Sequence, residues 1–511
     1  MKSLSATKLE VMKHAFISIP EQMGAALQRS AYSPNIKERK DESCALFTSD
    51  GDMLAQAEHI PVHLGAMPSS LKFAVKECKM VSGDQIILND PYSGGTHLPD
   101  ITLIKPVFYN SDLIGYTVNR AHHADVGGRI PGSMPGMSKT LDEEGIIISP
   151  RHAVKEGEIQ NEVLEVLKKA RSPEERMGDI RAQIGANEMG AIELKKIVKK
   201  FGLKDYKTFS EEILNYSEKR TRKVIKNLPK GVFIGQDFME WKHDIKLKVK
   251  ISIEGEGIKF DFSGTDKQVQ GNINAPKPVT LSAVYYVLRC LLPTDIPLND
   301  GCYQRVKIYT PKGSVLNPNP PAAVSAGNVE TSQRVVELIL NTLREPLSDT
   351  IPAESQGTMN NLIIGNENFT YYETIGGGAG AYPYGDGQDG VHVHMTNTKN
   401  TPIESLENEY PLMVNIYKLR DNSGGRGLYK GGEGIIRELE VLEDSWLSIQ
   451  SERRRYPPKG AEGGKDGEIG KNILINEKGE NILNGKITRK VKKGEKIRII
   501  SPGGGGWGEE E

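Results

Sequence analysis

Two short segments of the chain bring together imidazole and carboxylate side chains, the ligands that zinc, manganese and ferrous iron take from proteins. The segment GGTHLPD places His97 and Asp100 three residues apart in a glycine-rich loop. The segment RAHHAD carries His122, His123 and Asp125 directly after an apolar run. Because a spacing of three residues lets one turn present two ligands to one ion, these residues are candidates for a metal site.

The residues themselves leave the ligand set open. Asp41, in NIKERKDESCALF, is the best candidate for a further carboxylate. Two imidazoles with two carboxylates suit Mn, Fe or Zn better than Mg. Arg120 flanks the histidine pair, and His59 and His63 lie upstream as further polar groups. The alternative is that these histidines only form hydrogen bonds within turns, and spacing alone does not decide between the two.

The elements that must position these residues are predicted as strands joined by tight turns. Residues 101–118, ITLIKPVFYNSDLIGYTV, have the pattern of strand, polar turn and strand, and residues 44–54, CALFTSDGDML, repeat it. His122 lies 22 residues beyond Asp100. That separation is enough for a strand pair to bring it back beside the first turn.

Helices are predicted where apolar residues recur with the helical period. These segments are 7–32, two stretches within 172–228, 276–292 and 328–343. Ser172 is expected to cap the helix that begins at Pro173. Residues 245–253 alternate with period two and return after EGEG as a second strand, which predicts a hairpin.

The length of 511 residues corresponds to two to four domains. Without regular βα alternation, the element order predicts a multidomain α+β fold with mixed and antiparallel sheets. Glycine makes up 54 residues, which we expect in ordered turns and close backbone approaches. The predicted regions are 1–170 with the metal site, 171–230 helical, 231–350 with the hairpin, and 351–511 glycine-rich and β-dominated.

Composition and motifs exclude several classes of function. A formal net charge of -1 gives no reason to expect nucleic acid or an anionic membrane as a partner. Four widely spaced cysteines, a polar N-terminus and the lack of a long apolar stretch predict a cytoplasmic protein with reduced thiols. The chain has no GxxxxGK[ST] phosphate loop and no GxSxG nucleophile motif.

Long motifs run in order along essentially the whole chain. They include NDPYSGGTHLPD, RAHHADVGGRIPGSMPG, DIRAQIGANEMG, AGNVETSQR, YETIGGGAGAYPYGDGQDGVHVHMTNTKNTPIESLE and YKGGEGIIRE. Together these motifs resemble those of the hydantoinase B/5-oxoprolinase family. That family includes β-subunits of ATP-dependent N-methylhydantoinases and caprolactamase, the C-terminal half of eukaryotic-type 5-oxoprolinase, and subunits of acetone and acetophenone carboxylases.

The resemblance implies a β-subunit that hydrolyses a lactam or hydantoin ring. The family's metal ligands fall on Asp41, His97, Asp100 and His122, so His122 is preferred to His123 as the ligand. The ion implied is Zn, Mn or Fe, and it would activate a water for attack. ATP and Mg would be used by a hydantoinase A-type partner subunit, in a hetero-oligomer such as α2β2, that phosphorylates the ring first.

His123 and Asp125 are the candidates for catalytic proton transfer, or for support of the ligands, because each lies within a few residues of a proposed ligand. Two other functions stay open. One is a subunit of an ATP-dependent ketone carboxylase, and the other is a non-catalytic assembly subunit whose glycine-rich loops form an interface. The length of the chain favours the cyclic amidohydrolase, since the acetone carboxylase counterpart is considerably longer.

Overall fold

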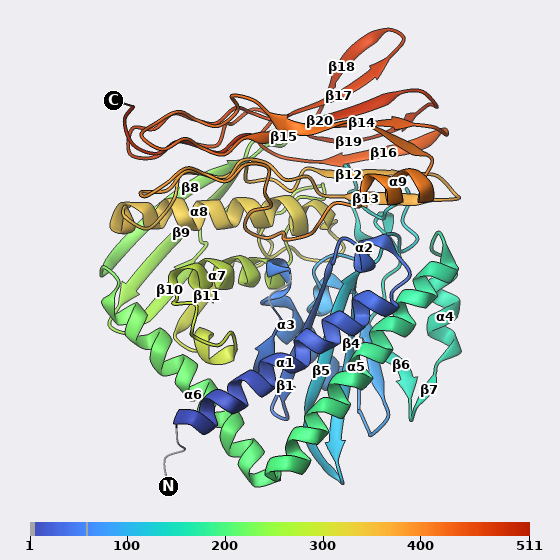
Figure 1. Ribbon diagram of the computed structural model, residues 1–511, viewed down its shortest axis with the longest axis vertical. Helices are drawn as coiled ribbons and strands as arrows, with labels where there is room; N and C mark the ends of the chain where they lie inside the picture. The colour runs from blue at the N-terminus through green and yellow to red at the C-terminus, as the bar shows by residue number, and fades with distance from the viewer. Residues whose placement is uncertain (1–5, 58–59, 511) are drawn as a thin grey trace.

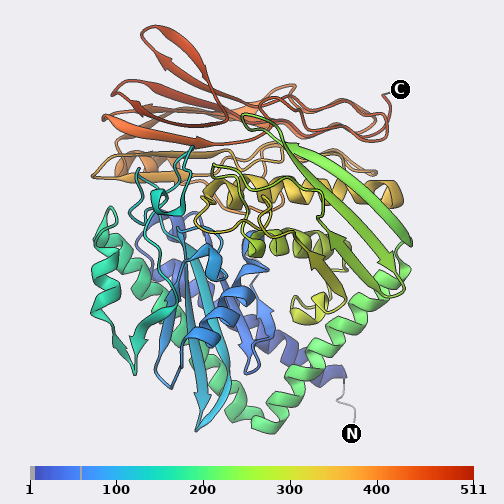
Figure 2. The ribbon, with the colours of Figure 1, turned by 180° about the vertical axis from the view of Figure 1, so that it is seen from behind.

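The predicted metal-site region forms a seven-stranded sheet in a computed structural model that describes residues 6–57 and 60–510 (Figures 1 and 2). Its strands are β1 (Glu42–Thr48), β2 (Met53–Gln56), β3 (Gln85–Leu88), β4 (Asp100–Tyr109), β5 (Asp112–His122), β6 (Arg151–Lys155) and β7 (Glu158–Ile159). They lie in the order β2-β1-β5-β4-β3-β6-β7, and neighbouring strands are antiparallel. The two predicted strand–turn–strand segments are confirmed as β1–β2 and β4–β5.

Helices cover both faces of this sheet. They include α1 (Ala6–Ser30), α2 (Pro34–Lys37), α3 (Ala66–Glu77), α4 (Asn161–Leu167), α5 (Pro173–Phe201) and α6 (Leu203–Asn227). Helices α1 and α5 lie side by side on one face (Figure 1). Cys44 and Leu46 of β1 pack in that core, whereas Ala45 and Phe47 pack with α3 on the other face. This alternation is the two-residue period of a strand buried on both sides.

The helices predicted within 7–32 and 172–228 are confirmed, but the predicted cap at Ser172 is wrong. Ser172 has φ 52° and ψ 57°, and its side chain makes no capping hydrogen bond. An N-cap needs an extended backbone so that the side-chain oxygen reaches the N–H groups of the first turn. The left-handed conformation of Ser172 directs that oxygen elsewhere.

A second sheet consists of β8 (Gly231–Met239), β9 (Ile245–Glu254), β10 (Gly257–Asp261) and β11 (Val306–Tyr309), in the order β11-β10-β9-β8. The predicted hairpin is confirmed as β9–β10, with Glu254 paired to Gly257. Helices α7 (Lys277–Leu291) and α8 (Ser332–Arg344) pack on each other, and α8 packs on β8 and β9. A π-helical turn, Gly327–Thr331, leads directly into α8. Helices α7 and α8 agree with the predicted segments 276–292 and 328–343.

Two further sheets stack at the C-terminal end of the molecule, over α8 (Figures 1 and 2). One has the order β13-β12-β16-β19 and the other β14-β15-β20-β17-β18. Their strands are β12 (Asn361–Gly365), β13 (Thr370–Glu373), β14 (Leu412–Arg420), β15 (Gly434–Val441), β16 (Ser445–Gln450), β17 (Lys471–Asn476), β18 (Gly479–Leu483), β19 (Lys486–Val491) and β20 (Lys496–Ile500), with helix α9 (Ile403–Glu409) beside them.

The glycine-rich loops of this end pack backbone against backbone, as the sequence predicts. A Cβ added at Gly504 would overlap the carbonyl oxygen of Ala379, and one added at Gly424 would overlap that of Gly431. Since neither carbonyl can move without breaking its loop, only glycine fits these two positions.

The predicted α+β fold with several sheets is confirmed. The division into four regions stays a prediction, although α5, from the predicted helical region, shares a core with the sheet that precedes it. Among residues 6–57 and 60–510, no helix combines the length and the apolar character that a membrane span requires.

Candidate metal centre

Asp100 and His122 meet because they occupy the open end of one hairpin. Strand β4 begins at Asp100 and β5 ends at His122, and the two residues are direct partners in the strand register. The backbone N–H of His122 donates to the carbonyl oxygen of Asp41 over 3.0 Å. Since β1 is the other neighbour of β5, Asp41 reaches the same edge of the sheet. The predicted strand pair therefore brings two of the four predicted ligands together, and the neighbouring strand β1 adds Asp41.

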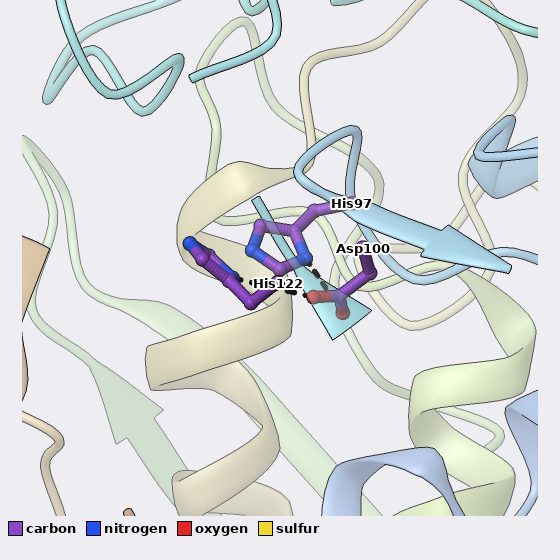
Figure 3. A group of neighbouring side chains, drawn as sticks. All are labelled: His97, Asp100 and His122. Atoms are coloured by element: carbon purple, nitrogen blue, oxygen red, sulfur yellow. Dashed lines mark hydrogen bonds and ion pairs between the residues drawn. The ribbon is translucent and has the colours of Figure 1, made fainter. Parts of the chain in front are cut away.

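His97 joins them from the loop before β4, and Figure 3 shows both imidazoles turned toward the Asp100 carboxylate. Nδ1 of His97 lies 2.9 Å from Oδ2 of Asp100. Nδ1 of His122 lies 3.3 Å from Oδ1 of the same carboxylate. Each of the three side chains offers a ligand atom within 4.8 Å of the other two. All three residues are at most 2% exposed.

The donor set fits a cation. Nε2 of His97 and Nε2 of His122 are buried, and neither has a hydrogen-bond partner within residues 6–57 and 60–510. A buried polar nitrogen without a partner is costly, and a metal ion is one way of satisfying two of them at once. Imidazole and carboxylate together are the ligands expected for Zn, Mn or Fe.

A small cavity of about 20 Å³ contains these groups, which is room for one water molecule or one ion. All four predicted ligands, including Asp41, line it. His63 lines it too: its Nε2 lies 3.5 Å from Oδ2 of Asp100, and its Nδ1 lies 2.8 Å from Oγ of Ser43. His59 lies outside the described residues.

The electrostatics prepare Asp100 and His122 for a cation. Burial raises the pKa of Asp100, but the charge of His97 and the hydrogen bonds of His122, His63 and His97 outweigh it and hold the pKa well below its usual range. Burial lowers the pKa of His122, against the opposing effects of Asp100 and Asp41. An ionised carboxylate beside a neutral imidazole is the protonation state in which both groups bind a metal.

His123 and Asp125 do not line this cavity in the part of the chain that is described. Nε2 of His123 lies 2.9 Å from Oε1 of Gln183 on α5, and burial lowers the pKa of His123 to about 4. Asp125 accepts hydrogen bonds from the backbone N–H of Gly127 over 2.8 Å and from the Arg171 guanidinium over 3.2 Å. These contacts fix the turn after β5 to the neighbouring elements, and the catalytic roles of the two residues stay predictions.

Two further residues of the cavity were not predicted as site residues. The Tyr372 ring stacks on His122 with ring centroids 4.6 Å apart, and the Arg39 guanidinium lies 4.6 Å from the centre of the Tyr372 ring. Nδ2 of Asn328, in the π-helical turn before α8, lies 2.9 Å from Nδ1 of His97. Both residues belong to motifs that carry the resemblance, AGNVETSQR and the stretch around YETIGGG, which was the available signal.

The fold and this cavity define an α+β protein with a buried His–Asp centre at the ends of two central strands of a sheet. The chain matches the family described as Hydantoinase B/oxoprolinase over residues 5–510, and it belongs to that family. The resemblance that the motifs indicated is thereby confirmed.

The chain is similar in sequence to curated relatives and in fold to solved structures. The chain is 42% identical to 5-oxoprolinase 1 of Arabidopsis thaliana over 98% of its own length, and it spans only 42% of that protein. The solved ATP-dependent caprolactamase from Pseudomonas jessenii has a TM-score of 0.93 at 26% identity, covering 99% of this chain and 92% of that chain. A nucleotide-free acetone carboxylase has a TM-score of 0.89 at 18% identity, covering 99% and 76%, and shows the shared fold alone.

Proposed function

We propose that this chain is the ring-opening subunit of an ATP-dependent cyclic amidohydrolase, which hydrolyses a lactam or hydantoin after a partner has phosphorylated it. The observation that carries the proposal is the buried group of His97, Asp100 and His122, with two imidazole nitrogens that have no partner among the described residues. Its support from relatives is the similarity of the whole chain to a caprolactamase and to a 5-oxoprolinase.

Asp41, His97, Asp100 and His122 would hold a divalent ion, with Zn, Mn and Fe all compatible with these ligands. When bound, such an ion supplies a water of lowered pKa and a positive charge that polarises a carbonyl oxygen. At this centre the contribution of the chain is positional: the Asp100 carboxylate orients both imidazoles, and the Thr96 hydroxyl donates to that carboxylate. His123 and Asp125 would act by fixing the backbone that carries His122.

The ATP step belongs on another polypeptide or domain. An unstrained amide resists hydrolysis because resonance weakens its carbonyl carbon as an electrophile. Phosphorylation of the amide oxygen would convert it into an imidate with a phosphate leaving group. A hydantoinase A-type partner would carry ATP and Mg, in a hetero-oligomer such as α2β2. The part of the plant 5-oxoprolinase that this chain does not span is consistent with a partner of that kind, and the cytoplasm is its expected location.

The proposal is tested by producing the chain with its partner and measuring ATP-dependent opening of 5-oxoproline, hydantoin and caprolactam. His97→Ala and Asp100→Ala should lose the bound metal, measured by elemental analysis, and at least about 10²-fold in turnover, since a metal supplies several kcal/mol. His152→Ala is the matched control: this histidine pairs with Asp84 over 3.3 Å on β6, outside the cavity.

Full turnover in the His97 and Asp100 variants would overturn the metal-dependent function. Bicarbonate-dependent consumption of a ketone, in place of ring opening, would show that the chain is a carboxylase subunit.

A further inference from the structure

A second cavity, of about 690 Å³, lies beside the metal centre, and we refer to it as the chamber. The chamber and the metal-centre cavity share two lining residues, Ile60 and Thr396. The segment 393–398 forms a wall between them, because His394 and Asn397 line the chamber while Met395 and Thr398 line the metal-centre cavity. A molecule in the chamber would therefore be next to the metal centre.

The chamber has the size and lining of a small-molecule site. Its wall is mainly aliphatic and aromatic, with contributions from Leu340, Ile351 and Val391, and polar or charged groups such as Arg289, Gln388 and His394 interrupt it. Binding sites for small ligands commonly measure 300–1,000 Å³ and combine an apolar wall with a few polar groups that fix orientation. The metal-centre cavity, at about 20 Å³, is too small for a five- to seven-membered ring.

One polar residue of the wall, His394, is held in place by both its backbone conformation and its side-chain contacts. Its φ of 56° is in the left-handed region, which a residue other than glycine seldom adopts and which surrounding structure must hold. Nε2 of His394 lies 2.7 Å from Oε1 of Glu337 on α8. The same carboxylate oxygen accepts the backbone N–H of Ser355 over 3.0 Å. The imidazole is thus fixed at both its backbone and its ring.

The partner of His394 is an anion. Burial raises the pKa of Glu337, but the charge and hydrogen bond of His394, with the charges of Arg453 and Arg344, hold the pKa below its usual value. A carboxylate on Nε2 selects the tautomer with the proton on that nitrogen, so Nδ1 is left as the proton acceptor. This carboxylate–imidazole arrangement is the one that general bases use.

We propose that the chamber binds the cyclic amide and that His394, oriented by Glu337, is the catalytic residue that transfers a proton during ring opening. This inference rests on the proposed function. It names where the ring would bind and which residue would carry the proton during ring opening, the step after phosphorylation. Glu337 is a positioning residue, because it acts through His394.

Ring opening consumes the phosphorylated ring and two water molecules, and it needs no other reactant. A water oxygen forms a bond to the ring carbon that carries the phosphorylated oxygen, and the ring C–N bond breaks with its electron pair left on nitrogen. Both protons of the water end on that nitrogen, and Nδ1 of His394 carries one of them. The carbon is released as an acyl phosphate, which a second water hydrolyses to carboxylate and phosphate, so His394 returns to its starting state.

The first variant is His394→Asn, because asparagine tolerates the left-handed backbone. In the complex with its partner we expect kcat to fall about 10²- to 10⁴-fold, the range for general acid–base catalysis, with KM changed by less than about threefold and metal content unchanged. Glu337→Gln should lower kcat by a smaller factor. His152→Asn is the matched control and should behave as wild type. A His394→Asn enzyme with wild-type kcat overturns the catalytic assignment.

A second variant tests the chamber without relying on turnover. Val391→Phe fills it, and calorimetry on the metal-loaded chain with hydantoin and caprolactam as probes should show binding weakened at least tenfold, most for the larger caprolactam ring. If neither probe binds the wild-type chain, or both bind Val391→Phe as tightly, the chamber is not the substrate site. A wild-type complex that binds the probes but opens no ring with ATP would instead refute the proposed function.

Discussion

Two glutamates of the α8 region are equally buried, but one is neutral and the other is ionised. Glu330 lies in the π-helical turn before α8, close to the metal centre, and Glu337 lies within α8, beside the chamber. Their exposed fractions are 0% and 1%. Burial, with the charge of Glu452, raises the pKa of Glu330 to about 8, despite Lys486 and the hydrogen bonds it accepts, whereas the pKa of Glu337 is lowered. Burial alone therefore does not decide whether an acid ionises.

The difference lies in the partners. Oε1 of Glu330 accepts hydrogen bonds from two neutral groups, the backbone N–H of Met359 over 3.0 Å and the Asn361 amide over 2.8 Å. Glu337 faces His394 and two arginines. A neutral acid beside the metal centre adds no competing charge there, whereas an anion behind His394 of the chamber wall can support an imidazole that gains and loses a proton. The metal centre thus has a neutral glutamic acid beside it, and the chamber has an ionised glutamate behind its histidine.

The largest effect on stability is expected from removing the ionised side chain of Glu337. Glu337→Ala should lower the free energy of unfolding by about 3–5 kcal/mol, because loss of one partner leaves buried polar and charged groups uncompensated. His394 and the N–H of Ser355 both lose their acceptor. Urea unfolding monitored by circular dichroism measures the change. A loss below about 1 kcal/mol would mean that water replaces the carboxylate and that the anion is not essential to the fold.

Glu330→Gln tests whether Glu330 is neutral in the folded protein, and we expect a somewhat smaller change in the free energy of unfolding. Between an unfolded pKa near 4.5 and the folded value of about 8, the unfolded chain loses this proton while the folded chain keeps it. The contribution of Glu330 to stability is therefore complete below about pH 4.5 and is lost as the pH rises toward 8. Glutamine can still accept both hydrogen bonds and has no proton to lose.

We therefore expect the stability of the Glu330→Gln protein, relative to wild type, to improve by about 3 kcal/mol between pH 4.5 and pH 7. Urea midpoints at several pH values provide the measurement, with Glu367→Gln as an exposed control that should track wild type. Parallel pH curves for Glu330→Gln and wild type would show that Glu330 is ionised in the folded protein, and the comparison of the two glutamates would fail.

Local sequence pattern was enough for the half of the site that strands position. The apolar runs around residues 101–118 and the spacing between Asp100 and His122 constrain a hairpin, and its register places the two side chains together. The residues offered Asp41 only as the best candidate for a further carboxylate, and the family resemblance was needed to place it in the ligand set. The strand register then explains why it belongs, since its carbonyl accepts the N–H of His122.

The half that depends on α8 could not be predicted, for physical reasons. Asn328 is 231 residues from His97, and His394 is 57 residues from Glu337. Such contacts depend on how layers stack, which helical and strand periods do not encode. The left-handed backbone of His394 gave no signal either, because histidine adopts that conformation only occasionally, whereas glycine adopts it readily. The failed cap at Ser172 has the same origin, since only its dihedral angles disqualify it.

The smallest expected effect is at Asn328, the neutral group of the metal-centre end that touches a proposed ligand. Its amide nitrogen lies 2.9 Å from Nδ1 of His97, and groups that orient a ligand histidine typically contribute 10- to 100-fold to metal affinity. Asn328→Ala should therefore weaken metal binding about tenfold while changing the free energy of unfolding by about 1 kcal/mol. Competition with a chromophoric chelator measures the affinity.

Asn328→Asp places a charge at the same position and should behave differently, because the anion can compete for the proton or the cation at His97. If both substitutions leave metal affinity unchanged, Asn328 has no part in preparing the metal centre. The surroundings of Glu330 and Glu337 would then differ only in charge.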